Sequence, residues 1–333
     1  MKLRHTAWPA PGADGDLLGG VVIGEFASMP AVHWPLQRLR APVLLAGAAR
    51  LQEVWHASGT VASGCSEGIH WRRSADVLFG VIELPEDSCD AAGNTPPLQV
   101  ASQRVYERTF DLLRAQGTPH LWRVWNYLAN INGESHGLER YRQFNQGRYT
   151  AFVQAQRDTG GQVPAACAIG VAAGPLSVAF LAGTTPLVPL ENPRQVSAWN
   201  YPAQHGPRAP SFSRAALAYP RGQEVLFVSG TASIVGHETV HAGDVTAQCV
   251  ESVRNIECML QEANRVARSG RVYSLEDLSH RVYVRHATDA DTVQRTLARL
   301  LRGAPVVCVQ ADICRTDLLV EIEAQAIRPM QLP

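Results

Sequence analysis

Three short stretches carry residue types at spacings that could do chemistry. Residues 237–241 read HETVH, a match to HExxH, in which two histidines one helical turn apart bind zinc and the glutamate acts as the base. That geometry needs both histidines on one face of a continuous helix, but Gly236 precedes the motif and Gly243 follows it. We therefore expect a loop that leads into a helix, and no zinc site.

The second stretch is GCSEG at residues 64–68, which has the spelling GxSxG. A nucleophile elbow requires a sharp strand-to-helix turn, with Asp and His partners later in the chain. This stretch is far in sequence from any expected helix start. It is therefore expected to be a glycine-bearing turn.

The third signal is Glu321 in DLLVEIEAQ. In a strand, Glu321 and Glu323 share one face with Leu319, while apolar residues alternate with them on the other face. A carboxyl group between apolar neighbours loses hydration, which raises its pKa and makes it a possible proton donor at neutral pH. The residues alone leave a second interpretation open, in which both glutamates lie on a solvated edge.

Composition excludes several classes of protein. The chain has 333 residues, enough for two domains, and its 30 basic residues balance 30 acidic ones, so no basic surface for nucleic acid or an anionic membrane is expected. The N-terminus lacks the apolar run of a signal peptide, and no stretch is long enough to span a membrane. Seven cysteines without a CxxC pair predict reduced thiols. We expect a soluble, cytoplasmic protein.

A repeat organises the chain. Ser-Gly-Thr occurs at 58–60 and at 229–231, and each copy precedes a helical pattern, a strand-like run, a second helical pattern and a closing pair of strands. In the second copy, Asp244 stands where a helix N-cap belongs. The sequence thus predicts an α+β fold made by tandem duplication. The predicted parts are an N-terminal extension (1–40), a degenerate first module (41–183), a Pro-rich linker (184–209) and a second module (210–333).

The second module resembles the Rid (YjgF-like) family in four motifs, PSFSRA, LFVSG, GDVTAQ and LLVEIEAQAI. With RVWNYLANINGE and LERYRQFNQGR added, the chain from about residue 40 to its C-terminus resembles the chorismatases, which are built on Rid-like folds. This resemblance implies a mixed sheet with helices packed on one face of each module. It also implies an enzyme that removes pyruvate from chorismate and uses no metal, flavin or nucleotide cofactor.

Site residues follow from the same resemblance. The acidic residue at the position of Glu321 belongs to the active site of both families, and would protonate the enolpyruvyl group. The first copy has Ala179 there, so only the second module would be active. Val306 stands about where Rid proteins carry a substrate-binding arginine. Cys314 falls where hydroxybenzoate-forming chorismatases have a site cysteine, which favours 3-hydroxybenzoate as the product, with or without 4-hydroxybenzoate.

Chorismate is a dianion, so its carboxylates call for arginine and hydroxyl donors. The expected substrate-binding residues are Arg142, Arg148, Tyr149 and Arg214, with Ala232 lining the pocket; each arginine could equally be a surface residue of an amphipathic helix. Rid modules commonly form trimers, but a linked pair could satisfy part of that interface internally, so the expected state is a monomer or a homotrimer. Three alternatives stay open: chorismate hydrolysis to a dihydroxycyclohexadiene carboxylate, a Rid-type imine deaminase, and a non-catalytic metabolite-binding protein.

Overall fold

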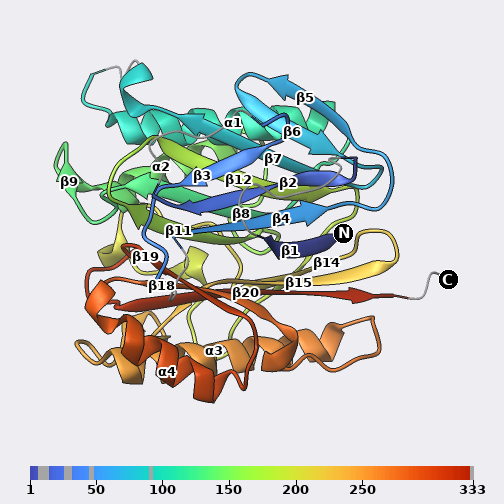
Figure 1. Ribbon diagram of the computed structural model, residues 1–333. Helices are drawn as coiled ribbons and strands as arrows, with labels where there is room; N and C mark the ends of the chain where they lie inside the picture. Colours follow the sequence, from blue (N-terminus) through green and yellow to red (C-terminus); the bar gives the residue numbers. More distant parts are fainter. Residues whose placement is uncertain (7–14, 26–31, 45–48, 90–92, 331–333) are drawn as a thin grey trace.

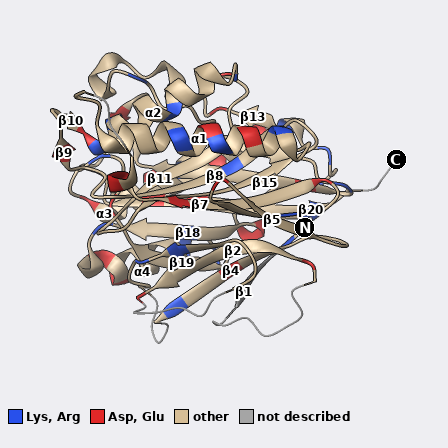
Figure 2. Cartoon of the chain, turned by 90° about the horizontal axis from the view of Figure 1, so that it is seen from above, with Lys and Arg blue, Asp and Glu red and all other residues tan. Residues whose placement is uncertain are grey.

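The computed structural model describes residues 1–6, 15–25, 32–44, 49–89 and 93–330. Two pairs of helices form the outer layers, and the sheets lie between them (Figure 1). Seen from above, acidic and basic residues are interspersed along the chain (Figure 2). Among the described residues, no helix is both long enough and apolar enough to cross a membrane.

The first module is a six-stranded sheet covered on one face by two helices. Its elements are β5 (Ala62–Ser66), β6 (Ile69–Arg73), β7 (Val77–Leu84), α1 (Pro97–Ala115), β8 (His120–Ala129), α2 (Arg140–Gln154), β11 (Ala165–Val171) and β12 (Leu176–Gly183). The strand order is β11-β8-β12-β7-β6-β5, and only β11 and β8 run parallel. A small hairpin, β9 (Glu134–Ser135) and β10 (Leu138–Glu139), precedes α2.

The second module repeats this topology. Its elements are β13 (Val188–Leu190), β14 (Ala215–Ala218), β15 (Gln223–Ala232), α3 (Val245–Val266), β18 (Ser279–Val284), α4 (Ala290–Leu300), β19 (Val306–Gln310) and β20 (Val320–Pro329). The order β19-β18-β20-β15-β14-β13 matches the first sheet strand for strand, again with one parallel pair, β18 and β19. The predicted α+β duplication is therefore confirmed.

Residues 1–40, which the sequence left without a role, contribute to a third sheet. Its strands are β1 (Lys2–Thr6), β2 (Leu17–Gly24), β3 (Leu36–Leu39) and β4 (Arg50–His56), in the order β1-β4-β2-β3. Because β4 belongs here, the Ser-Gly-Thr at 58–60 is not the counterpart of 229–231. The true counterpart of β15 is β7, since both pair with the last strand of their module.

The segment 184–209 is not the simple linker expected from its proline content. It contains β13, which pairs with β14, and two single turns of 3-10 helix, η2 (Ala198–Asn200) and η3 (Ala203–His205). Asn192 is buried and donates to the main-chain oxygen of Asn255 on α3. Proline removes a donor but is compatible with an edge strand such as β13, so proline content alone does not separate a linker from a sheet edge.

Local signals explain the helices that cover the second sheet. The Asp244 carboxylate accepts the Ala247 amide at 2.9 Å and so caps α3, as predicted. The buried side chains on α3, including Cys249, Val253 and Ile256, recur at helical spacing and pack on the apolar face of β15 and β20. The opposite face of this sheet meets the first module and the third sheet in one shared core.

Candidate active site

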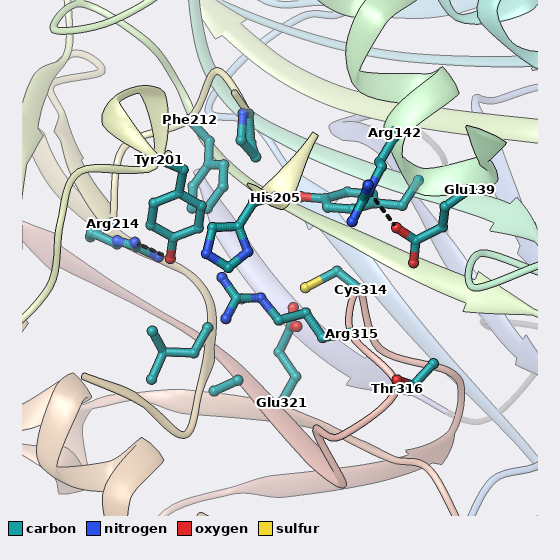
Figure 3. Close-up of a pocket in the computed structure, with 15 residues that line it drawn as sticks. Glu139, Arg142, Tyr201, His205, Phe212, Arg214, Cys314, Arg315, Thr316 and Glu321 are labelled. Carbon is teal, nitrogen blue, oxygen red and sulfur yellow. Dashed lines mark hydrogen bonds and ion pairs between the residues drawn. The ribbon is translucent and has the colours of Figure 1, made fainter. Parts of the chain in front are cut away.

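A cavity of about 240 Å³ lies where the two modules meet (Figure 3). Three parts of the chain line it: the start of α2, the segment that precedes β14, and the strands and loops around β15 and β20. The lining residues are Glu139, Tyr141, Arg142, Tyr201, His205, Pro210, Phe212, Arg214, Gly230, Ala232, Ile234, Cys314, Arg315, Thr316 and Glu321. Of the residues predicted for the site, Glu321, Cys314, Arg142, Arg214 and Ala232 thus come together here.

Glu321 lies on the wall of this cavity that β20 provides. It pairs with Ala232 on β15, next to a register shift between Val228 and Thr231. The shift brings Gly230 so close that a Cβ there would lie 1.8 Å from Glu321 Oε1. A side chain at residue 230 would occupy the place where the carboxyl group now lies, and Glu321 is only 4% exposed.

Burial decides the protonation state of Glu321. Loss of hydration, and then the neighbouring Glu323, raise the pKa of its carboxyl group to about 8, against the opposing effect of Arg123, Arg214 and Arg285. The carboxyl group is therefore mostly protonated at neutral pH. The predicted desolvation is present, and the solvated-edge interpretation does not apply.

Glu323 faces a different environment, a buried network that joins all three sheets. It forms ion pairs with Arg123 on β8 and, at 3.0 Å, with Arg281 on β18. Arg281 in turn binds Glu53 on β4 and donates to the Tyr127 hydroxyl at 2.9 Å. These charges are buried and mutually compensated, so the network fixes how the sheets meet beside the cavity.

Cys314 lines the cavity from the loop between β19 and β20. Burial and then the nearby Glu321 raise the pKa of its thiol to about 12, so it is a neutral thiol and a poor nucleophile. Arg285 holds the loop by donating to the main-chain oxygens of Ile313, Arg315 and Leu318 at 3.1, 2.7 and 2.8 Å. Cys314 therefore borders the cavity as a small, neutral side chain.

Two arginines give the cavity excess positive charge. Arg214 is buried and donates to the Tyr201 hydroxyl at 2.7 Å and to the Val196 oxygen at 2.8 Å. Arg315, which the sequence did not single out, donates to the His237 oxygen at 2.9 Å. The Glu191 carboxylate, which accepts the main-chain amide of Arg214 at 3.0 Å, offsets part of the Arg214 charge. Among the described residues, Arg214 Nε and Arg315 Nη2 lack any acceptor. Such a cavity suits an anionic ligand.

The arginines of α2 differ in their placement. Arg142 lines the cavity, but Glu139 pairs with it at 3.1 Å and the Gln204 oxygen accepts from it at 3.1 Å. Arg148 is buried and lines an adjoining space of about 30 Å³, which shares Cys314 and Glu321 with the main cavity. Arg148 therefore borders the small adjoining space and not the main cavity.

Tyr149 lines neither of these two spaces, contrary to the prediction. Its ring lies under the guanidinium of Arg208, 4.7 Å from the ring centroid, and is partly exposed. Successive residues of an α-helix point about 100° apart, so Tyr149 turns away from the side on which Arg148 lies. Proximity in sequence to a site residue was a misleading signal here.

The motifs that the sequence analysis set aside are placed as expected. Residues 64–66 are the end of β5, and Glu67 and Gly68, both at positive φ, form the turn of the β5–β6 hairpin. HETVH lies in the hairpin of β16 (Ile234–Val235) and β17 (Glu238–Thr239), ahead of α3. Its two histidines do not share a helix face: His241 lies 3.7 Å from a carboxylate oxygen of Glu251 on α3, whereas His237 faces His205.

Sequence reasoning missed Tyr201 and His205, which line the cavity from the segment interpreted as a linker. The aromatic rings in this Pro-rich stretch were the feature that could have indicated them, because large aromatic side chains are uncommon in a solvated linker. His205 Nε2, His237 Nδ1 and a Glu238 carboxylate oxygen all lie within 4.8 Å of one another, and of the described residues these three form the group that could hold a metal ion.

Comparison with known proteins identifies the family. Residues 53–182 match the family model for "Chorismatase FkbO/Hyg5-like, N-terminal". A chorismatase from Streptomyces rapamycinicus is 45% identical over 279 residues, which is 81% of this chain and 80% of that protein. A 3-hydroxybenzoate synthase from Streptomyces hygroscopicus is 33% identical over 325 residues, 94% of this chain and 92% of that protein. The crystal structure of a chorismatase superposes with a TM-score of 0.85 at 35% identity and covers 98% of both chains. This chain, with its duplicated fold, thus belongs to the chorismatase family.

Proposed function

We propose that this protein converts chorismate into pyruvate and 3-hydroxybenzoate, with Glu321 as the general acid. The observation that carries the proposal is a buried carboxyl group with a pKa of about 8 in a cavity with excess positive charge. The names of its relatives, chorismatase and 3-hydroxybenzoate synthase, support chorismate as the substrate.

The proposed first step is proton transfer from Glu321 to the methylene carbon of the enolpyruvyl ether. Protonation gives the ether carbon oxocarbenium character and makes the ether oxygen a leaving group. The hydroxyl oxygen at ring C4 bonds to C3 as the ether C3–O bond breaks and pyruvate leaves. The C4–O bond then opens, the ring loses the hydrogen at C3 as a proton and aromatises, and that proton restores Glu321. A carboxylic acid with a pKa near the working pH is suited to this step, because it is protonated in the resting enzyme yet gives up its proton readily. All atoms of chorismate are divided between pyruvate and hydroxybenzoate, so no other reactant is required.

Arg214 and Arg315 are the proposed partners of the substrate carboxylates. Both line the cavity, and among the described residues both retain a side-chain donor without an acceptor. Arg142 is a weaker candidate, because Glu139 already neutralises part of its charge. Two guanidinium groups on a dianion also disfavour the imine deaminase alternative, whose substrates do not call for two cationic partners.

Cys314 supports formation of a hydroxybenzoate. Its neutral thiol borders the same space as Glu321 and occupies room that a water molecule would otherwise need. Hydrolysis to a dihydroxycyclohexadiene carboxylate is the competing outcome, and it consumes one water molecule per turnover.

The test is incubation of the purified protein with chorismate. Pyruvate is followed with lactate dehydrogenase and NADH, and the ring product is separated against standards of 3-hydroxybenzoate, 4-hydroxybenzoate and the diol. Pyruvate with 3-hydroxybenzoate is the expected result. Pyruvate with the diol would overturn the product assignment, and binding of chorismate without pyruvate release would identify a non-catalytic binding protein.

A further inference from the structure

Three potential metal ligands meet at the edge of the cavity, from segments far apart in sequence. His205 comes from the 3-10 turn η3, while His237 and Glu238 come from the β16–β17 hairpin. His205 Nε2 lies 3.2 Å from His237 Nδ1, which lies 2.9 Å from Glu238 Oε1. One ligand atom of each of the three residues lies within 4.8 Å of the other two.

The spacing of the two ring nitrogens fits one tetrahedral ion. Zinc binds imidazole nitrogen at about 2.0–2.1 Å, and the tetrahedral angle then separates two such nitrogens by roughly 3.3 Å. The observed 3.2 Å between His205 and His237 is close to this value. A carboxylate oxygen is the third ligand that borderline divalent ions accept beside two imidazoles.

The surroundings hold the ligands in place. Gln204 Nε2 donates to Glu238 Oε1 at 3.0 Å, and the ring of Tyr201 packs 5.2 Å from that of His205. Arg315 donates to the main-chain oxygen of His237 at 2.9 Å. Such supporting contacts orient ligands before an ion arrives.

Charge nearby acts in both directions. The Arg315 and Arg142 guanidinium groups oppose a cation, although Glu139 pairs with Arg142 at 3.1 Å. Glu238 supplies the negative charge.

We propose that His205, His237 and Glu238 bind a zinc ion, or a similar divalent transition-metal ion, at the mouth of the cavity. His205 lines that cavity, whereas 31% of the His237 side chain and 62% of the Glu238 side chain are exposed, so an ion can enter from solvent. The site shares His237 and Glu238 with HETVH but is not a zincin site, because His241 faces Glu251 instead.

The test uses tag-free, full-length protein that has been stripped with a chelator and kept reduced. Co²⁺ is titrated as a spectroscopic probe, because tetrahedral coordination gives intense visible bands, and Zn²⁺ is then used to displace it in a calorimeter. One ion per chain is the expected stoichiometry. Binding is measured without chorismate, so its outcome is independent of the proposed enzymatic function.

The variants His205→Ala and His237→Ala are each expected to weaken Zn²⁺ binding by at least about tenfold, and Glu238→Gln by less. His241→Ala is the matched control and should bind as the wild type does. Circular dichroism confirms that each variant is folded; if His205→Ala unfolds, His205→Gln replaces it. The proposal is overturned if binding is not saturable, if His241→Ala loses as much affinity as His237→Ala, or if alkylation of the thiols abolishes binding.

Discussion

Glu321 and Glu323 lie two residues apart on the same face of β20, yet they occupy opposite environments. Both Glu323 oxygens pair with buried guanidinium groups, from Arg123 and Arg281. Glu321 faces the gap left by Gly230 and has no ion-pair partner among the described residues. Strand alternation therefore decides which face a carboxylate occupies, but the residues across the strand decide whether it stabilises the fold or remains an acid.

The largest effect is expected when the acid is removed. Glu321→Gln keeps the shape and the hydrogen-bonding capacity of the side chain but cannot donate the proton, so the rate of pyruvate release should fall by about 10²–10⁴-fold. The lactate dehydrogenase assay measures this rate, and equilibrium binding of chorismate serves as the control for an intact cavity. A rate within tenfold of the wild type would contradict the assignment of Glu321 as the acid.

Breaking the paired carboxylate should act on stability instead. Glu323→Gln leaves Arg123 and Arg281 buried without full compensation, so the free energy of unfolding should fall by roughly 3–5 kcal/mol. Urea unfolding followed by circular dichroism measures the change. Glu321→Gln is the matched comparison, because it removes the neighbouring carboxylate without breaking an ion pair; equal destabilisation of the two variants would refute the contrast.

The pH dependence gives a third way to separate the two carboxylates. Because the proposed acid must be protonated, turnover should decline as pH rises through about 8, the pKa of Glu321. The free energy of unfolding should also decrease as pH rises. The pKa in the folded state lies above the ordinary 4.5, so the contribution of this group is complete at low pH and is lost as pH rises from about 4.5 through about 8.

Glu321→Gln has no such titration and supplies the reference for this measurement. The melting temperature of the wild type should therefore fall relative to that of the variant as pH rises through this window. Thermal melts of both proteins in matched buffers provide the data. A constant difference between the two proteins would mean that Glu321 has an ordinary pKa.

Much of the fold was predictable because its signals are local. The N-cap at Asp244 and the helical spacing of α3 depend on residues within a few positions of one another. The duplication was recognised, but Ser-Gly-Thr was matched to the wrong strand. Strand pairing identifies β7 as the partner of β15, and pairing is a long-range property that a three-residue match does not contain.

The site was predicted only in part, because some of its residues have local signals and others depend on long-range contacts. Glu321 was found because alternation along one strand places it between apolar neighbours. Tyr201, His205 and Arg315 were missed because the contacts that bring them to the cavity join three separate parts of the chain. The space that Gly230 leaves for the Glu321 carboxyl group likewise depends on a register shift between β15 and β20. It can therefore be recognised only after these two strands are paired.

A smaller effect on rate is expected at Cys314. Cys314→Ala enlarges the cavity beside Glu321 without removing a charge, because the thiol is neutral. Pyruvate release should stay within about tenfold of the wild type, while the ring product shifts towards the diol as water gains room. Chromatography of the products measures the shift, and Cys258→Ala, on the outer part of α3, is the control. An unchanged product ratio would remove Cys314 from the product-determining role.

The smallest effect is expected at Tyr149, and it extends the same comparison to a helix. Arg148 and Tyr149 are adjacent, but only Arg148 borders the space beside Glu321. Tyr149→Phe should therefore leave kcat/KM within about twofold and the free energy of unfolding within about 0.5 kcal/mol, as for a surface substitution. Arg148→Met is the matched variant, and steady-state assays should show a loss of about tenfold or more, because a buried cation beside the acid is removed. If Tyr149→Phe proved the more damaging of the two, the direction in which each side chain points from α2 would not be what decides function here.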